Sequence, residues 1–384
     1  MKNLYLRLSS VYFIYYAFVG GFVPYWGLYL KSLHFSPTDI GLLLSLFQFS
    51  RVFAPSFWGW LTDHTERRTA WIKLTAGLGM VSFIGVFFGT SFAWLFMVMA
   101  ILSLFTSSTL PLLESTTLAL IKRYRQPDSH SYSHIRLWGS IGFVVAVIVL
   151  GLLLDYYPVD ILLWLLLALQ VILVGLTFTI PEPAIVKHTE TYFSIWHVLK
   201  TPTVLATMFA SVLMVGAHSV YYSFFSIYME AQGYSKSVIG ILWAIGVLCE
   251  IGIFIIMPKL MTRFTLKSII LLSLSLAVLR FSVIGLQAQS LWLIVLVQAL
   301  HAMTFGAFHA SSIEIIEHYF KGRYQARGQA IYNSMGYGVG GVIGGVTGGL
   351  MMQHVGGTAT FLLAASYPLV AILIVAIWLK TGQD

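Results

Sequence analysis

The sequence predicts an all-α membrane protein whose twelve transmembrane helices form two pseudo-symmetric six-helix bundles. Composition is the first observation behind this prediction: 58% of the residues are hydrophobic and 9% are charged, whereas a soluble domain carries roughly 25% charged residues. The second is a series of apolar runs, each long enough to cross a ~30 Å hydrocarbon core as a helix. The third is a weak internal repeat that relates the two halves of the chain.

The spans follow one another with short polar turns between them. The first apolar run comes after Lys2 and Arg7 and has no small-x-small cleavage site. We therefore expect it to remain as a helix rather than to be removed as a signal peptide. The expected spans are residues 4–30, 38–61, 71–89, 93–119, 135–154, 161–180, 202–230, 237–257, 267–287, 291–317, 327–353 and 358–379.

The longest polar interruption falls near the midpoint of the chain and indicates where the two halves meet. It covers residues 181–201, with the sequence PEPAIVKHTETYFSIWHVLKT. We expect an N-terminal six-helix bundle at 1–180, a cytoplasmic linker at 181–201 and a C-terminal six-helix bundle at 202–384.

The two halves also resemble each other in sequence. Residues 40–43 (IGLL) align with 239–242 (IGIL), and the same offset places Arg51 on Glu250. Charges that fall on matched positions argue against chance similarity between apolar helices. Parallel repeats of this kind build two-bundle membrane proteins that bind their ligand near the middle of the membrane.

The basic residues indicate the orientation in the membrane. The formal net charge is +8, and Lys and Arg concentrate in alternate loops, whereas the other loops contain Lys31 and Lys236. By the positive-inside rule both termini are expected in the cytoplasm. The basic residues follow the topology rather than forming a patch with aromatic residues, so no nucleic-acid partner is expected.

Charged residues inside the expected spans are the main functional signal. They are Arg51, Glu114, Arg136, Glu250, Arg280 and Glu314. At about 3 kcal/mol each on an insertion scale, six unpaired charges in lipid would cost on the order of 18 kcal/mol. Acids and bases are equal in number, so we expect mutual pairing or a wet cavity. An arginine that moves toward or away from a buried carboxylate changes its proton affinity, and proton coupling requires such a change.

Helical spacing places polar and aromatic residues beside these charges. Arg136 shares a face with Ser140. Glu250 shares a face with Trp243. Aromatic residues on the first and seventh spans are further candidates, although aromatic stripes more often serve packing. The candidate substrate-binding residues are Tyr16, Glu114, Arg136, Trp138, Ser140, His218, Tyr222, Trp243, Glu250 and Asn333.

A polar turn after the second expected span carries a spaced set of residues, which are Gly59, Asp63, Arg67 and Arg68. The spacing resembles the signature of the major facilitator superfamily, whose loop between helices 2 and 3 reads G-x-x-x-D-R-x-G-R-R/K. His64 and Glu66 stand where that signature has its first arginine and its second glycine. The resemblance implies a conformational switch at the four matched residues, because an acid at a helix end can hold a neighbouring helix N-terminus.

Further motifs narrow the resemblance. They are PYW at 24–26, IRLWGSIGF at 135–143, GVLCEI at 246–251, FGAFHA at 305–310 and GQAIY at 328–332. Together they are similar to phenylpropionate permeases, in the same broad group as the nucleoside:proton symporters.

Similarity to lactose permease and its relatives implies individual roles. Glu114 and Arg136 are expected to hold substrate. The residues expected to handle the proton are Glu250, Arg280, His309 and Glu314. His309 precedes Glu314 by five residues and His301 lies further away, so neither forms a tight i, i+3 pair with this acid.

We favour a proton-coupled symporter of a small organic solute that works by alternating access. The resemblance and the scarcity of amide side chains in the spans favour an aromatic carboxylate such as 3-phenylpropionate. The alternatives are a proton-coupled sugar or nucleoside symporter, and a drug or metabolite:proton antiporter that uses the same fold.

An enzyme is not expected, because the loops leave little chain for a catalytic domain and no activated nucleophile or metal-ligand cluster stands out. The single cysteine, Cys249, lies in an apolar run and provides no disulfide framework. We expect no cofactor and no metal, with the proton gradient as the energy source. The expected partners are a small-molecule substrate, protons and the lipid bilayer, around a monomer in the bacterial inner membrane.

Overall fold

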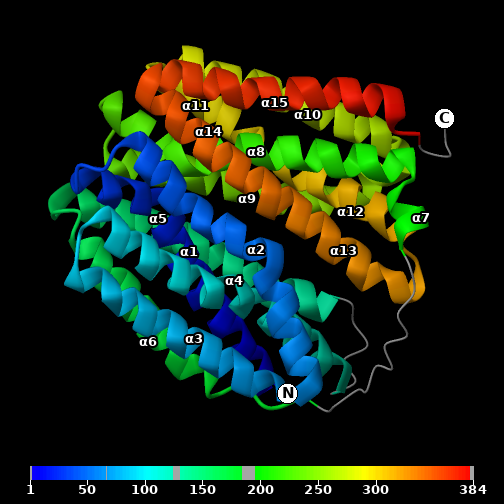
Figure 1. Cartoon of the computed structure of the whole chain (residues 1–384), viewed down its shortest axis with the longest axis horizontal. Helices are drawn as coiled ribbons and strands as arrows, with labels where there is room; N and C mark the ends of the chain where they lie inside the picture. The colour runs from blue at the N-terminus through cyan, green and yellow to red at the C-terminus, as the bar shows by residue number, and fades with distance from the viewer. Residues whose placement is uncertain (1, 66, 124–129, 184–194, 381–384) are drawn as a thin grey trace. The chain divides into compact units, whose positions relative to one another are not determined.

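The computed structural model describes residues 2–65, 67–123, 130–183 and 195–380. Within these ranges helices follow one another and no strand occurs (Figure 1). The elements are α1 (Lys2–Ser32), α2 (Pro37–Thr65), α3 (Arg68–Ile84), η1 (Gly85–Phe88), α4 (Phe92–Arg123), α5 (His130–Tyr156), α6 (Ile161–Thr177), α7 (Trp196–Leu199), α8 (Pro202–Ala231), α9 (Lys236–Arg263), α10 (Leu266–Leu286), α11 (Leu291–Ala299), η2 (Ala302–Ala307), α12 (Phe308–Tyr319), η3 (Gly322–Tyr324), α13 (Gln325–Asn333), η4 (Ser334–Gly340), α14 (Gly341–His354) and α15 (Gly357–Trp378).

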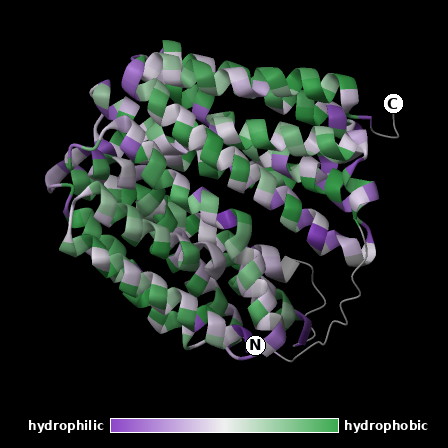
Figure 2. Cartoon of the chain, in the orientation of Figure 1, coloured by the Kyte–Doolittle hydropathy of each residue, from purple (hydrophilic) through white to green (hydrophobic). Residues whose placement is uncertain are grey.

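Each expected span coincides with a helix or with a broken helix. In the described ranges, nine helices are long and apolar enough to cross a membrane, and α2, which bends by 43°, makes a tenth. The two remaining spans are α6, with 17 residues, and the glycine-rich series from α13 through η4 to α14. Hydrophobic residues run along the long helices (Figure 2). The all-α membrane architecture is confirmed.

Local sequence explains several helix starts. Ser36 and Asp39 form a reciprocal cap before α2: Asp39 N donates to Ser36 Oγ at 3.1 Å, and Ser36 N donates to Asp39 Oδ2 at 3.3 Å. Thr265 caps α10 by accepting from Ser268 N. Pro202 occupies the first turn of α8, where its missing N–H costs nothing. These caps satisfy backbone donors that the helix itself leaves open.

Contacts divide the chain into two compact units. The first comprises Met1–Phe35, Phe53–Glu190 and Ser235–Gly240. The second comprises Ser36–Val52, Thr191–Tyr234 and Ile241–Asp384. The first half of α2 therefore belongs to the second unit, and the first turn of α9 to the first unit. The simpler division into bundles at 1–180 and 202–384 stays a prediction.

Helix α1 occupies the centre of the first unit, where it packs against α5 and α6, while α3 packs against α4 and α6. A Cβ at Gly142 on α5 would collide with the carbonyl oxygen of Phe13 on α1. Glycine thus permits close approach of the two helices. Leu8, Tyr12 and Leu113 are fully buried in one hydrophobic cluster of this unit.

Helix α8 has the same place in the second unit. It packs against α14 and α15, and α10 packs against α15 and α12 (Figure 1). In its most apolar stretch, 78% of the α8 residues are buried. Polar side chains on α8, among them His218 and Tyr221, must therefore find partners inside the protein.

The packing of α8 against α14 predicts a stability difference between two glycine substitutions. A Cβ at Gly344 would collide with the carbonyl oxygen of Gly216 and lie 2.9 Å from Ser219 Cβ. A Cβ at Gly175, on α6, would meet nothing within 4 Å among the described residues. We expect Gly344→Ala to destabilise the folded protein by roughly 1–3 kcal/mol through overpacking.

The measurement is the melting temperature of the detergent-solubilised protein. Gly175→Ala is the matched control and should melt at or slightly above the wild-type temperature, because alanine favours a helix. Equal melting temperatures for the two variants would contradict the close α8–α14 contact.

Candidate functional site

Arg136, on α5, lies between an acid and a tyrosine in the first unit. Its Nη2 donates a hydrogen bond to the hydroxyl of Tyr16, on α1, at 2.5 Å, and its Cζ lies 4.1 Å from the centre of the Tyr16 ring. Its Nε lies 3.9 Å from Oε1 of Glu114, on α4. The side chains of Arg136 and Glu114 are 33% and 36% exposed, so both retain accessible polar atoms.

The close contact between α1 and α5 positions this arginine. A Cβ at Gly139 would lie 2.6 Å from the Tyr16 ring and 3.1 Å from Arg136 Nη1, so the absence of a side chain there makes room for both groups. Tyr132, one turn before Arg136, lies close enough to Glu114 to interact with its carboxylate. The structure thus brings together three residues that the sequence selected, Tyr16, Glu114 and Arg136, and adds Tyr132.

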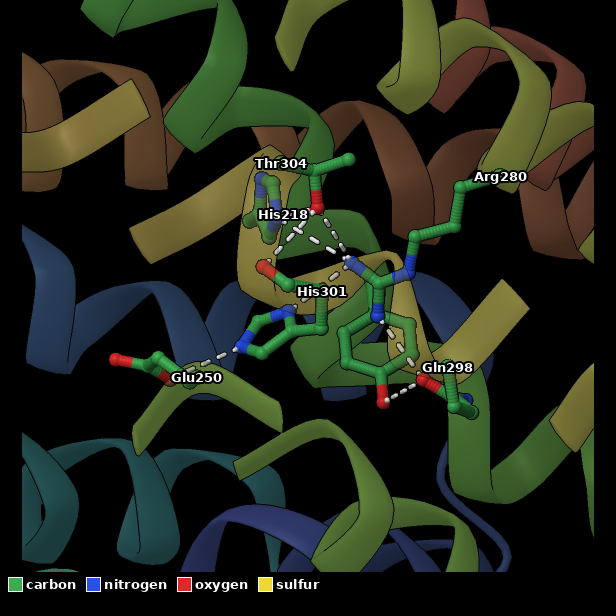
Figure 3. A network of polar contacts seen from close by, with 7 residues as sticks. His218, Glu250, Arg280, Gln298, His301 and Thr304 are labelled. Atoms are coloured by element: carbon green, nitrogen blue, oxygen red, sulfur yellow. Dashed lines mark hydrogen bonds and ion pairs between the residues drawn. The ribbon is translucent and has the colours of Figure 1, made fainter. Parts of the chain in front are cut away.

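Arg280, on α10, is the centre of a buried network in the second unit. Its side chain is fully buried. Its Nη1 lies 3.1 Å from His301 Nδ1 and 3.3 Å from Thr304 Oγ1. Its Nη2 donates to Gln298 Oε1 at 3.1 Å, and its Cζ lies 4.4 Å from the centre of the Tyr221 ring. Figure 3 shows Arg280 pointing into this group of acceptors.

Hydrogen-bond chemistry assigns the protons of the two histidines in this network. An arginine N–H can only donate, so His301 Nδ1 accepts from Arg280 and His301 Nε2 carries the hydrogen. His218 Nδ1 lies 2.9 Å from the carbonyl oxygen of Met214 and donates to it. His218 Nε2, 3.4 Å from Arg280 Nη1, therefore accepts. Both rings are neutral imidazoles, in opposite tautomers.

Glu250, on α9, completes a chain of three groups. Its Oε2 lies 3.5 Å from His301 Nε2, and its side chain is 20% exposed, against 8% for His301. His301 thus lies between a fully buried arginine and a partly accessible carboxylate (Figure 3). One imidazole ring therefore separates Glu250 from Arg280.

Glycines and an irregular helix place this chain of groups. A Cβ at Gly246 would lie 3.4 Å from His301 Cβ, and one at Gly306 would lie 3.3 Å from Glu250 Cγ. His301 immediately precedes η2, a π-helical turn. Such turns occur often at functional sites, because the extra residue changes the direction of the following side chains.

His301 is absent from the residues that the sequence selected. His301 was considered only for its spacing from Glu314 along the sequence. Its contacts in the structure are instead with Glu250 on α9 and with Arg280 on α10. The signal that could have found it is the pair of glycines, one in GVLCEI and one in FGAFHA, which indicates a close helix contact between those motifs.

Two further predicted substrate-binding residues are tryptophans. Trp243 is 4% exposed and donates to Ser226 Oγ at 3.0 Å, while its ring packs against Tyr222. Trp138 is 39% exposed and donates to the hydroxyl of Tyr5.

The two remaining candidates are small polar residues. Ser140 is half-buried on α5, and Asn333 is exposed on α13. Among the described residues, neither makes a hydrogen bond to Arg136 or Arg280.

The two other residues expected to handle protons lie on α12. His309 Nδ1 is 3.5 Å from each of the hydroxyls of Tyr332 and Tyr337. Glu314 is exposed, and in the described part of the chain it makes no ion pair with Arg280.

An acid that follows α6 contacts the start of α3, next to the turn between α2 and α3. A Cβ at Gly59 would meet nothing within 4 Å in the described ranges. Arg67 precedes α3 and Arg68 begins it, whereas the side chain of Asp63 lies outside the described residues. Thr69 donates to the carboxylate of Glu182 through both its N–H and its hydroxyl. Glu182 therefore caps α3, a role that no sequence motif indicated.

No group of three or more His, Cys, Asp or Glu side chains in the described ranges could hold a metal ion. The available chemistry is thus that of arginine, carboxylate, imidazole and tyrosine. These groups can bind an anion or a polar solute and can gain or lose a proton.

Comparison with known proteins places the chain in a family. The profile of the MFS_1 like family matches residues 5–363. A probable 3-phenylpropionic acid transporter from Escherichia coli (strain K12) is 31% identical over 86% of each chain. A maltose permease from Geobacillus stearothermophilus is 22% identical over 96% of this chain and 93% of the permease.

Solved structures agree on the fold. The crystal structure of a point mutant of the nucleoside transporter NupG superposes with a TM-score of 0.89 at 20% identity, covering 98% of this chain and all of the transporter chain. A second NupG crystal structure gives a TM-score of 0.84 at 21% identity over 99% of this chain and 100% of NupG. The predicted major facilitator fold is confirmed. The chain therefore belongs to the MFS_1 like family and is a multi-pass membrane transporter of the major facilitator type.

Proposed function

We propose that this transporter is a proton-coupled symporter of a small aromatic carboxylate, such as 3-phenylpropionate. It works as a monomer in the bacterial inner membrane, with both termini in the cytoplasm. It works by alternating access, and the proton gradient supplies the energy without a cofactor. The observation that carries the proposal is the chain of groups from Arg280 through His301 to Glu250.

Glu250 is the proton site. It is the acid of this chain of groups, and it is partly accessible, whereas Arg280 is fully buried and keeps its proton. While Glu250 is ionised, its negative charge is balanced by Arg280 through the neutral ring of His301. A proton on Glu250 removes this balance and leaves positive charge in a medium of low dielectric constant. An anionic substrate then restores the balance, so proton and anion favour each other's binding.

The substrate class has two supports. The relative from Escherichia coli is named as a probable 3-phenylpropionic acid transporter. In addition, aromatic rings lie against His301, the neighbour of Glu250: the Phe305 ring stacks on His301 at 5.3 Å, and Tyr222 packs edge-on to it at 6.4 Å. Flat aromatic solutes gain favourable stacking energy against such rings.

Replacement of the proton-site acid should separate binding from coupling. We expect Glu250→Gln, which resembles the protonated acid, to exchange labelled for unlabelled substrate in proteoliposomes. It should fail to concentrate substrate when a pH gradient is applied. In the wild-type protein, one pH unit can drive about tenfold accumulation if one proton moves with each substrate, because one unit corresponds to about 1.36 kcal/mol.

Glu314→Gln is the matched control, because Glu314 is exposed on α12. It should accumulate substrate as the wild-type protein does. Accumulation by Glu250→Gln under a pH gradient would show that the proton binds elsewhere, and loss of accumulation in Glu314→Gln alone would move the proton site to that acid.

The substrate class can be tested by ligand-induced stabilisation. We expect 3-phenylpropionate to raise the melting temperature of the solubilised protein, whereas uridine and maltose do not. At roughly a hundred times its dissociation constant, a ligand stabilises by about 2.7 kcal/mol. Linkage to one proton should strengthen the affinity by up to about tenfold for each unit of falling pH. Stabilisation by uridine at either pH, without any effect of 3-phenylpropionate, would favour a nucleoside substrate.

A further inference from the structure

We propose that Arg51, on α2, binds the carboxylate group of the substrate. This inference rests on the proposed function, and it assigns a residue and an anion-binding role to a position that neither cluster includes. It comes from the charges in the spans, the surroundings of Arg51 and the aromatic wall beside it. Every residue that carries it lies in the second unit.

The other two intramembrane arginines already have partners. Arg136 is engaged by Glu114 and by the hydroxyl of Tyr16. The terminal nitrogens of Arg280 face four side-chain acceptors, which are His218, Gln298, His301 and Thr304. Both arginines therefore have hydrogen-bond partners that a ligand would first have to displace.

Arg51 differs from them. Its side chain is exposed on the chain surface, and its contact among the described residues is with a ring: Arg51 Cζ lies 5.6 Å from the centre of Tyr337. No carboxylate of the described chain lies within ion-pair distance of it. A tyrosine ring attracts a cation but offers no counter-charge, so the guanidinium donors of Arg51 remain open to an anion.

The position of Arg51 along α2 places its charge deep in the membrane. Arg51 stands fourteen residues after Pro37, the first residue of α2, which is about 21 Å along a helix of about 1.5 Å rise per residue. A charge at that depth lies within the hydrocarbon layer, where it is retained when it has a partner or faces water. An anionic substrate is a partner that the transport cycle itself would supply.

An aromatic wall lies next to Arg51. Tyr337 contacts His309 with ring centres 5.9 Å apart, and Phe305 at 6.4 Å. Phe305 in turn stacks almost parallel on His309, at 6.1 Å and 10°. This wall, formed by Phe305, His309 and Tyr337, presents ring faces and edges to a flat aromatic solute. A carboxylate on a short chain attached to that solute would reach toward Arg51.

The wall also connects Arg51 to the proton site. Tyr337 and Tyr222 each lie within electrostatic range of both Arg51 and Glu250. While Glu250 is ionised, it repels a carboxylate that approaches Arg51. Protonation of Glu250 removes that repulsion, so the proton binds before the anion or together with it.

The test compares a carboxylate with its neutral amide. Binding of 3-phenylpropionate and of 3-phenylpropanamide is measured by isothermal titration calorimetry on the full-length, detergent-solubilised protein. We expect Arg51→Gln to weaken 3-phenylpropionate by about tenfold to a hundredfold, the range for loss of a charge-assisted hydrogen bond. It should leave 3-phenylpropanamide within about twofold. Arg51→Lys should fall between, because lysine keeps the charge and loses the bidentate geometry.

Arg263→Gln is the matched control, since it removes an exposed arginine of the same unit at the end of α9. It should leave the affinity of both ligands unchanged. An equal loss of both ligands in Arg51→Gln, or an unchanged ratio of their affinities, would overturn the role of Arg51. A wild-type protein that binds neither ligand would instead overturn the proposed substrate class. The two failures are therefore distinguishable.

Discussion

The permanent charge of Arg280 governs the polar chemistry of the second unit. Its guanidinium is fully buried and can only donate, so every side chain around it must accept. His301 meets this demand with Nδ1, which leaves its Nε2–H directed at Glu250. One buried cation thus sets the tautomer of the ring and couples it to the acid. A lysine in its place would lose the planar fork that holds several acceptors at once.

The first unit also contains an arginine next to an acid, but its arginine is more exposed than Arg280. Arg136 and Glu114 are about one third exposed, and their 3.9 Å separation is long for a charged hydrogen bond. Arg280 is buried and has acceptors on both terminal nitrogens. A long, partly exposed ion pair contributes little to stability, whereas a buried arginine depends on the acceptors that surround it. The arginine of the second unit is therefore the more strongly fixed of the two.

The sequence predicted the features that depend on a local pattern of residues. It did not predict the features that depend on contacts between helices far apart in the chain. Apolar runs report on each span separately, so the spans and the fold class followed from them. His301 was missed because the π-helical turn after it breaks the assumed period and its partners lie on α9 and α10. Glu182 was missed because its role depends on the N-terminus of α3. The assignment of 36–52 to the second unit likewise depends on tertiary contacts.

The internal repeat relates the residue proposed to bind the anion to the residue proposed to bind the proton. It aligns Arg51 with Glu250, and both residues act on Tyr337 and Tyr222. Two positive charges there would repel each other at all times, and two acids would reject an anion. In the proposed mechanism, one charge of each sign, of which the acid takes up the proton, makes the anion's affinity depend on that proton. Coupling by this proposed mechanism requires no proton transfer to the substrate, because the two ligands interact through the electric field that both residues create.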